Sequence, residues 1–181
     1  MGLLSFFRRA RQSDAKSAAI YMAVVLQARN PAFYAALGVP DTVDGRFDLI
    51  VLHAMLVMRR LREEGPALED LTQGLFDYMF KDMDRSLREI GVGDMGVGKH
   101  VKKMAKAFYG RAEEYEIGID GSAESIDVAL KRNIYRSTTP TEDQLAAMSC
   151  YLWAADEVLR TRSIDDVAQG RLTWPVVGGQ G

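Results

Sequence analysis

Four glycines and a lysine in one short segment match two patterns that bind phosphate in nucleotide enzymes. The residues are Gly91, Gly93, Gly96, Gly98 and Lys99. The first three glycines match GxGxxG, and Gly93, Gly98 and Lys99 match GxxxxGK. Either pattern holds a phosphate only where a buried strand aims the glycine loop and the next helix at it. Between positions 71 and 90, apolar residues recur at helical three-four spacing, which predicts a helix before the glycines. We therefore interpret the four glycines as a turn between two helices and not as a nucleotide site.

The histidines and the cysteine do not form a recognisable catalytic or metal-binding pattern. A helical di-iron site needs Glu three residues before a histidine, whereas residues 50 and 97, three before His53 and His100, are Ile and Val. His53 lies in the longest apolar segment, where we expect a hydrogen-bonded core residue. Cys150 is the only cysteine, and we expect it to be a small core residue of an apolar helix. The sequence thus favours a protein without catalytic residues, bound metal or cofactor.

A row of lysines marks one side of the helix expected after the glycines. Apolar residues at positions 101, 104, 105, 108 and 112 share one face of this helix. The opposite face carries Lys99, Lys102, Lys103 and Lys106. Such a face is either solvated or a docking surface for an acidic protein helix, a phospholipid head group or RNA phosphate.

Three further residues near the turn are candidates for partner contact. Asp82 and Asp94 flank the glycines and have no obvious oppositely charged partner nearby in the sequence. Met95 lies inside the glycine segment, where we expect it to be exposed and adaptable. Together with the four lysines, these residues form the predicted partner-binding surface.

Several short runs resemble, in the same order, the ubiquinol-cytochrome c chaperone family. The runs are Asn30–Tyr34, Gly38–Thr42, Gly45–Asp48, Leu52–His53, Arg60–Leu61, Asp82–Asp84, Leu87–Glu89, Gly91–Asp94 and Lys99. The resemblance covers roughly residues 20–135 and points to a bacterial member. It implies a non-catalytic chaperone that holds newly made cytochrome b during assembly of ubiquinol-cytochrome c reductase, respiratory complex III. A second assembly-factor subunit is a further candidate partner.

The first twelve residues form a basic, amphipathic segment. Its candidate membrane-contact residues are Leu3, Leu4, Phe6, Phe7, Arg8 and Arg9. The apolar run is too short to span a bilayer, and it lacks the cleavage site of a secretory signal. It suits a short helix on an anionic leaflet, with folding back onto the domain or fraying as the alternatives. Together with the resemblance, the segment predicts a cytoplasmic protein peripheral to the inner membrane.

The segments that carry these residues all have the sequence pattern of helices. Periodicity and stop signals predict helical segments at 14–28, 31–37, 42–64, 67–90, 97–117, 122–135, 141–160 and 163–169. Segment 42–64 is apolar nearly all round, so we expect it at the centre. The fold prediction is an all-α, single-domain bundle of about six to eight helices over residues 13–170, followed by a flexible tail over 171–181.

The composition is that of an ordinary globular protein and limits the choice of partners. The chain has 181 residues, 48% of them hydrophobic and 27% charged, with a net charge of −2. A global basic field for nucleic acid is therefore excluded, and any anion-binding surface must be local. A pocket between the helices that holds quinone or haem stays open as an alternative function.

Overall fold

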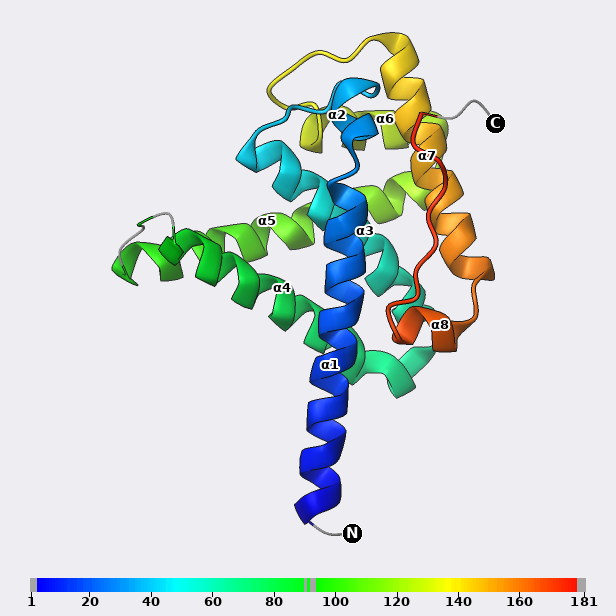
Figure 1. Cartoon of the computed structure of the whole chain (residues 1–181). Coiled ribbons are helices and arrows are strands. Elements are labelled where there is room, and N and C mark those ends of the chain that lie inside the picture. The colour runs from blue at the N-terminus through cyan, green and yellow to red at the C-terminus, as the bar shows by residue number, and fades with distance from the viewer. Residues whose placement is uncertain (1–2, 90, 92–93, 179–181) are drawn as a thin grey trace.

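The computed structural model describes residues 3–89, 91 and 94–178, and the side chains of residues 13–89, 91, 96–99 and 101–178. The α-helices are α1 (Leu3–Ala28), α2 (Pro31–Ala35), α3 (Val43–Glu63), α4 (Glu69–Glu89), α5 (Asp94–Asp120), α6 (Ala123–Asn133), α7 (Glu142–Thr161) and α8 (Ile164–Ala168). A short 3-10 helix, η1 (Gly65–Leu68), joins α3 to α4. Within the described residues no strand occurs, and the helices pack into one domain (Figure 1). The predicted all-α fold is confirmed.

Four helices, α2, α3, α6 and α7, begin directly after a residue whose side chain caps the helix. α3 begins after Thr42, whose hydroxyl accepts the Gly45 N–H at 3.1 Å. α7 begins with a capping box, in which Thr141 Oγ1 accepts the Gln144 N–H at 3.2 Å and Gln144 Oε1 accepts the Thr141 N–H at 3.0 Å. Asp14 was expected to be an N-cap, but α1 begins at Leu3 and runs through it. Positions 3–13 contain neither glycine nor proline, so nothing there stops the helix from extending.

The centre of the domain is α3, as predicted from its apolar surface. It contacts α1, α4, α5, α7 and α8. Most of its length is buried, including the charged residue Asp48, which is 1% exposed. Asp48 pairs with Arg111 of α5 (2.7 Å, Nη1 to Oδ1) and with Arg136 after α6 (3.2 Å, Nε to Oδ2). A buried carboxylate is costly without partners, so these ion pairs tie α5 and the segment after α6 to the central helix.

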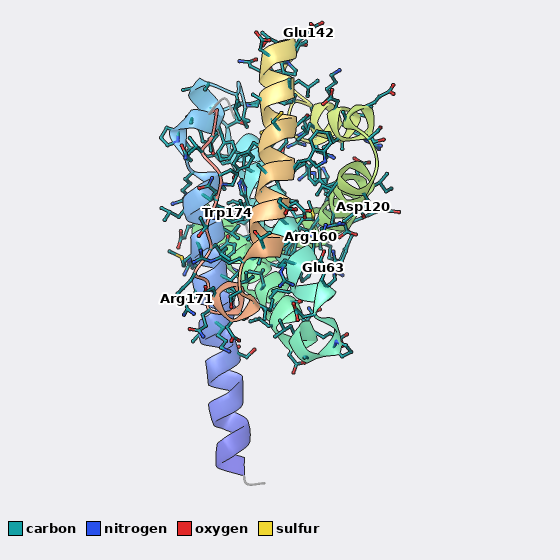
Figure 2. The ribbon with its side chains drawn as sticks, turned by 90° about the vertical axis from the view of Figure 1, so that its right-hand side faces the viewer. Glu63, Asp120, Glu142, Arg160, Arg171 and Trp174 are labelled. Atoms are coloured by element: carbon teal, nitrogen blue, oxygen red, sulfur yellow. The ribbon has the colours of Figure 1, made fainter. Side chains whose placement is uncertain are left out.

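The C-terminal segment 171–178 lies against the domain, which differs from the expected flexible tail. It runs between α1 and α7, where Trp174 is labelled in Figure 2. The Trp174 ring meets the His53 ring edge to face, with 4.9 Å between the centroids. Val177 is 8% exposed. Burial of these two apolar side chains holds the segment in place, and residues 179–181 lie outside the described part of the chain.

Candidate functional site

Helices α4 and α5 form an arm that extends away from α7 and α8 (Figure 1). At its tip Gly91 has φ 88° and donates its N–H to the Arg88 carbonyl at 3.0 Å. That left-handed conformation is the one expected of a glycine that ends a helix. Gly96 and Gly98 were expected in the turn, but they lie in the first turns of α5. A helix tolerates glycine there at a cost of about 1 kcal/mol each, and Gly93 lies outside the described residues.

The four lysines of α5 lie on the exposed side of the arm. We call Lys99, Lys102, Lys103 and Lys106 the lysine stripe; all four are exposed. Val101, Met104 and Phe108 lie on the opposite face and pack against the core. Among the described side chains, no carboxylate forms an ion pair with any of the four lysines. The stripe is therefore a concentrated local positive charge on a protein whose net charge is slightly negative.

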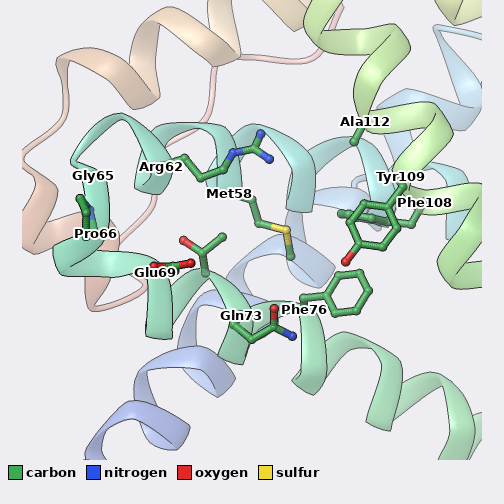
Figure 3. Close-up of a pocket in the computed structure, with 11 residues that line it drawn as sticks. Met58, Arg62, Gly65, Pro66, Glu69, Gln73, Phe76, Phe108, Tyr109 and Ala112 are labelled. Carbon is green, nitrogen blue, oxygen red and sulfur yellow. The ribbon is translucent and has the colours of Figure 1, made fainter.

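A groove lies where the arm meets the body, between the end of α3, η1, α4 and α5 (Figure 3). We call it the aromatic groove, and its volume is about 490 Å³. It is lined by Met58, Arg62, Gly65, Pro66, Glu69, Thr72, Gln73, Phe76, Phe108, Tyr109 and Ala112. The Phe76 ring lies 5.3 Å from the Tyr109 ring and 5.4 Å from the Phe108 ring, measured between centroids. Tyr109 remains 60% exposed, so the groove presents aromatic surface to solvent.

The polar groups around the aromatic groove are largely engaged within the protein. Arg62 forms an ion pair with Glu116, and the Thr72 hydroxyl donates to the Leu68 carbonyl at 3.0 Å. Gln73 donates its amide N–H to Asp77 at 2.8 Å. A hollow lined by aromatic rings, in which Arg62, Thr72 and Gln73 are engaged within the protein, suits a nonpolar segment of another molecule better than a polar metabolite.

The acidic residues predicted for partner contact have different surroundings from those expected. Asp82 accepts a hydrogen bond from the Tyr21 hydroxyl, with 3.0 Å between the oxygens, and pairs with Arg85, so it has partners within the protein. Burial, followed by the charge of Asp82, raises the pKa of Tyr21. Asp82 thus joins α4 to α1, a contact that sequence proximity could not show. Asp94 begins α5 and Met95 follows it, and both side chains lie outside the described ones.

The candidate membrane-contact residues lie in the first turns of α1. The side chains of Leu3, Leu4, Phe6, Phe7, Arg8 and Arg9 are outside the described ones, but their backbone is helical. This end of α1 extends beyond α4 and η1 (Figure 1). Positions 3, 6 and 7 share the helical register of buried residues 21, 24 and 25, which lie five turns later. In the described part of the chain, no helix has the length and apolarity needed to cross a membrane.

His53 is a hydrogen-bonded core residue, as expected. It is fully buried, with Nδ1 2.7 Å from the Leu49 carbonyl and Nε2 2.7 Å from the Tyr151 hydroxyl. A carbonyl only accepts, so Nδ1 carries the proton and Nε2 accepts from Tyr151, whose oxygen accepts from the Gln27 amide at 2.9 Å. Desolvation lowers the pKa of His53 to about 4. The ring is therefore neutral and has no free nitrogen for catalysis.

Cys150 differs from its expected place because its side chain is exposed. The buried side of α7 is formed by Leu145, Met148 and Leu152, and Cys150 lies off that side. Among the described residues, no group of three or more histidines, cysteines and acids is placed to hold a metal ion. The side chain of His100 is outside the described ones.

Comparison with protein-family models gives a match over most of the chain. The model described as ubiquinol-cytochrome C chaperone matches residues 35–174. The chain belongs to the ubiquinol-cytochrome c chaperone family. The resemblance carried by its sequence motifs is thereby confirmed, and the match reaches the C-terminal segment with Trp174.

One solved structure shares the fold, and several named proteins share part of the sequence. The crystal structure of the Cbp3 homolog from Brucella abortus is 36% identical, covers 98% of both chains and superposes with a TM-score of 0.83. Ubiquinol-cytochrome-c reductase complex assembly factor 1 from Xenopus laevis is 22% identical over 78% of this chain and 72% of its own. The Mus musculus and Homo sapiens proteins of that name are also 22% identical, and the match covers 48% of each. The chain thus spans about half the length of these two mammalian relatives.

Sequence reasoning missed the aromatic groove, although it included some of its residues. Phe76 and Phe108 were assigned to helical core faces, and each does pack against the core. Tyr109 follows Phe108 by one residue, about 100° further round α5, at the edge of its apolar face. A large aromatic residue at that edge is the one sequence signal for an exposed apolar surface beside the core.

Proposed function

We propose that this protein is a non-catalytic assembly chaperone that binds a hydrophobic membrane-protein client, cytochrome b, during assembly of ubiquinol-cytochrome c reductase. Membership of the chaperone family and the similarity to ubiquinol-cytochrome c reductase complex assembly factor 1 support this role. The observation that carries the binding site is the aromatic groove, where Tyr109 is 60% exposed beside two phenylalanines. Exposed aromatic surface does not stabilise a monomer in water, whereas a nonpolar client segment would gain binding energy by burying it.

The experiment places a photo-reactive phenylalanine analogue at position 109 in cells that assemble complex III. Tyr109 already presents an exposed aromatic ring, so the analogue needs no change in packing. A matched control places the analogue at Val43, which is 82% exposed at the start of α3. We expect adducts with cytochrome b from position 109 and none from position 43. Equal adducts from both positions, or none from position 109, would reject the aromatic groove as the client site.

A charge in the aromatic groove tests whether client binding is nonpolar. Tyr109→Glu should lower the cytochrome b that copurifies with the protein by about tenfold, which corresponds to ~1.4 kcal/mol. The fold should be unaffected because the side chain is largely exposed, and circular dichroism checks this. Copurification at the wild-type level would contradict the proposal.

Peripheral attachment to the cytoplasmic face of the inner membrane forms part of the proposal. Its support is the basic and apolar N-terminal segment, whose helix extends past the neighbouring helices. Deleting residues 2–11 should move the protein from membrane to soluble fractions. Unchanged partitioning would remove this part and leave the client site untouched.

The alternative role, a quinone or haem carrier, makes a different spectroscopic prediction. A haem in the aromatic groove would need an axial ligand, and among its lining residues Met58 and Tyr109 could provide one. Purified protein that is colourless and copurifies with cytochrome b supports the chaperone. A bound chromophore in the purified protein would favour the carrier.

A further inference from the structure

The outer face of α5 continues well beyond the lysine stripe. Its exposed residues follow helical three-four spacing and are Lys99, Lys102, Lys103, Lys106, Gly110, Glu113 and Ile117. This strip is about 27 Å long at 1.5 Å per residue. It lies beside the aromatic groove and is a separate surface, since only Tyr109 at the edge of the strip also lines that groove.

The far end of the strip borders a second hollow, between α5 and α6. It has a volume of about 400 Å³ and includes Ile117 and Val128, which are 61% and 60% exposed. The two helices approach closely beside it because residue 118 is glycine. A Cβ on Gly118 would lie 2.7 Å from Ile126 Cδ1. Two large apolar side chains therefore flank a hollow that α6 leaves open to solvent.

The charge along α5 reverses between the lysine stripe and this hollow. Near the hollow, Glu114 pairs with Arg132 at 2.8 Å and accepts an Asn133 amide N–H at 2.8 Å. Glu113 and Glu124 are exposed in the same region. RNA or an anionic bilayer is negative along its whole length, so it would be attracted at one end of the strip and repelled at the other. A protein helix can carry carboxylates at one end and apolar residues at the other.

We propose that an amphipathic helix of a water-soluble protein, distinct from the membrane client, docks along this outer face. Its carboxylates lie against the lysine stripe, and a large apolar side chain enters the hollow beside Ile117 and Val128. The centre of the stripe and Ile117 are separated by about 20 Å along α5. The acidic and apolar parts of the partner helix are therefore about fourteen residues apart. The proposal stands on charge complementarity and does not depend on the client groove.

Two glycines of α5 allow this surface to be probed without removing a lysine. A Cβ added at Gly98 or at Gly110 would meet no atom within 4 Å. Gly110 lies in the middle of the face, and Gly98 flanks its charged part, next to Lys99 and one turn before Lys102. A photo-reactive residue at each position, in separate full-length proteins, samples these two parts in living cells. Val43 again serves as the control position, because it is 82% exposed and lies on α3.

The expected result is that both probes react with one helix of one protein, at sites about twelve residues apart. The site reached from Gly98 should lie among acidic residues, and the site reached from Gly110 toward the apolar part. Adducts of the Gly98 probe with RNA, with lipid or with cytochrome b would overturn the proposal. Two unrelated protein adducts, or no protein adduct from Gly98, would also overturn it.

Charge reversal then tests the complementarity directly. Replacing the four lysines of the stripe by glutamate should lower the adduct yield from both probes at least about tenfold, and replacing the partner's acids by lysine should restore it. Val128→Asp should lower the yield while leaving the charges of the stripe unchanged. Undiminished yield in both variants would contradict the proposal. Client adducts from position 109 should persist in these variants, which separates failure of this inference from failure of the chaperone assignment.

Discussion

The buried histidine makes the stability of this protein sensitive to acid. His53 is fully buried, and desolvation lowers its pKa to about 4 from 6.5 for the free group. In the unfolded chain the imidazole binds a proton as the pH falls below 6.5, whereas in the folded protein it stays neutral until about pH 4. Because the unfolded state binds more protons in this window, the free energy of unfolding decreases as the pH falls through it.

The magnitude follows from the two pKa values. Each pH unit between them changes the free energy of unfolding by about 1.4 kcal/mol, so acidification from about pH 7.5 to 5 costs ~2 kcal/mol from His53. The hydrogen bonds explain why the folded state resists protonation. A charged ring would donate from Nε2, and the Tyr151 hydroxyl that now donates to it would have to turn toward another acceptor.

Asp48 acts in the opposite direction and must be separated from His53. Burial raises the pKa of the Asp48 carboxyl to about 6, although Arg111 and Arg136 lower it. The folded state then binds the extra proton between pH 6 and 4, which raises the free energy of unfolding on acidification by about 1.4 kcal/mol at pH 5. In the wild-type protein, the effects of His53 and Asp48 on the pH dependence of the free energy of unfolding therefore partly cancel.

The assay compares urea unfolding at two pH values in wild type and His53→Gln. Glutamine stays neutral throughout, so the wild type should lose about 2 kcal/mol more than the variant between pH 7.5 and 5. Asp48→Asn is the matched control, and it should lose about 1.4 kcal/mol more than wild type over the same interval because the opposing contribution is gone. Identical pH dependence in wild type and His53→Gln would show that His53 takes up its proton at an ordinary pKa. That result would refute the reasoning.

Three further predictions concern stability and are read by chemical denaturation at pH 7.5. Gly110→Ala should raise the free energy of unfolding by about 0.5–1 kcal/mol because the added Cβ meets open space within a helix. Gly118→Ala should lower the free energy of unfolding because its Cβ would lie 2.7 Å from a side chain of α6. A change of the same sign in both variants would contradict this explanation. Tyr21→Phe should cost about 1.5 kcal/mol by removing the donor to Asp82, and an unchanged midpoint would show that bond to be dispensable. Trp174→Ala should cost about 2 kcal/mol, since its half-buried ring packs on the buried histidine, and no loss would indicate a segment that adds nothing to the fold.

The helices themselves were predictable because each depends on information close in the sequence. The segment expected at 42–64 is α3, Val43–Glu63, since an apolar run capped by Thr42 and stopped by Gly65 leaves little choice. Periodicity likewise placed the lysine stripe opposite the buried side of α5. These predictions needed no knowledge of which helix contacts which.

The errors arose where local signals compete with each other or with distant contacts. Gly96 and Gly98 carry the composition of a turn, yet they lie in α5. Asp82 appeared unpaired along the sequence, and its hydrogen-bond partner Tyr21 comes from α1. Trp174 was placed in a flexible tail, although it packs against His53 of the central helix. The contacts of Asp82 with Tyr21 and of Trp174 with His53 join segments far apart in the chain, so local sequence does not show them.

The aromatic groove arises from the same geometry that hid it from sequence reasoning. Gly65 has φ 74° and ends α3, and η1 then redirects the chain into α4. α4 and α5 consequently leave the body together (Figure 1), and no residue of α6, α7 or α8 lines the groove. Phe76 and Tyr109 are left at an edge that no further helix of the described chain covers. Apolar side chains from a further element would bury this surface and stabilise the protein, and no described element does so. The exposed groove therefore favours a protein whose aromatic surface is covered by a partner.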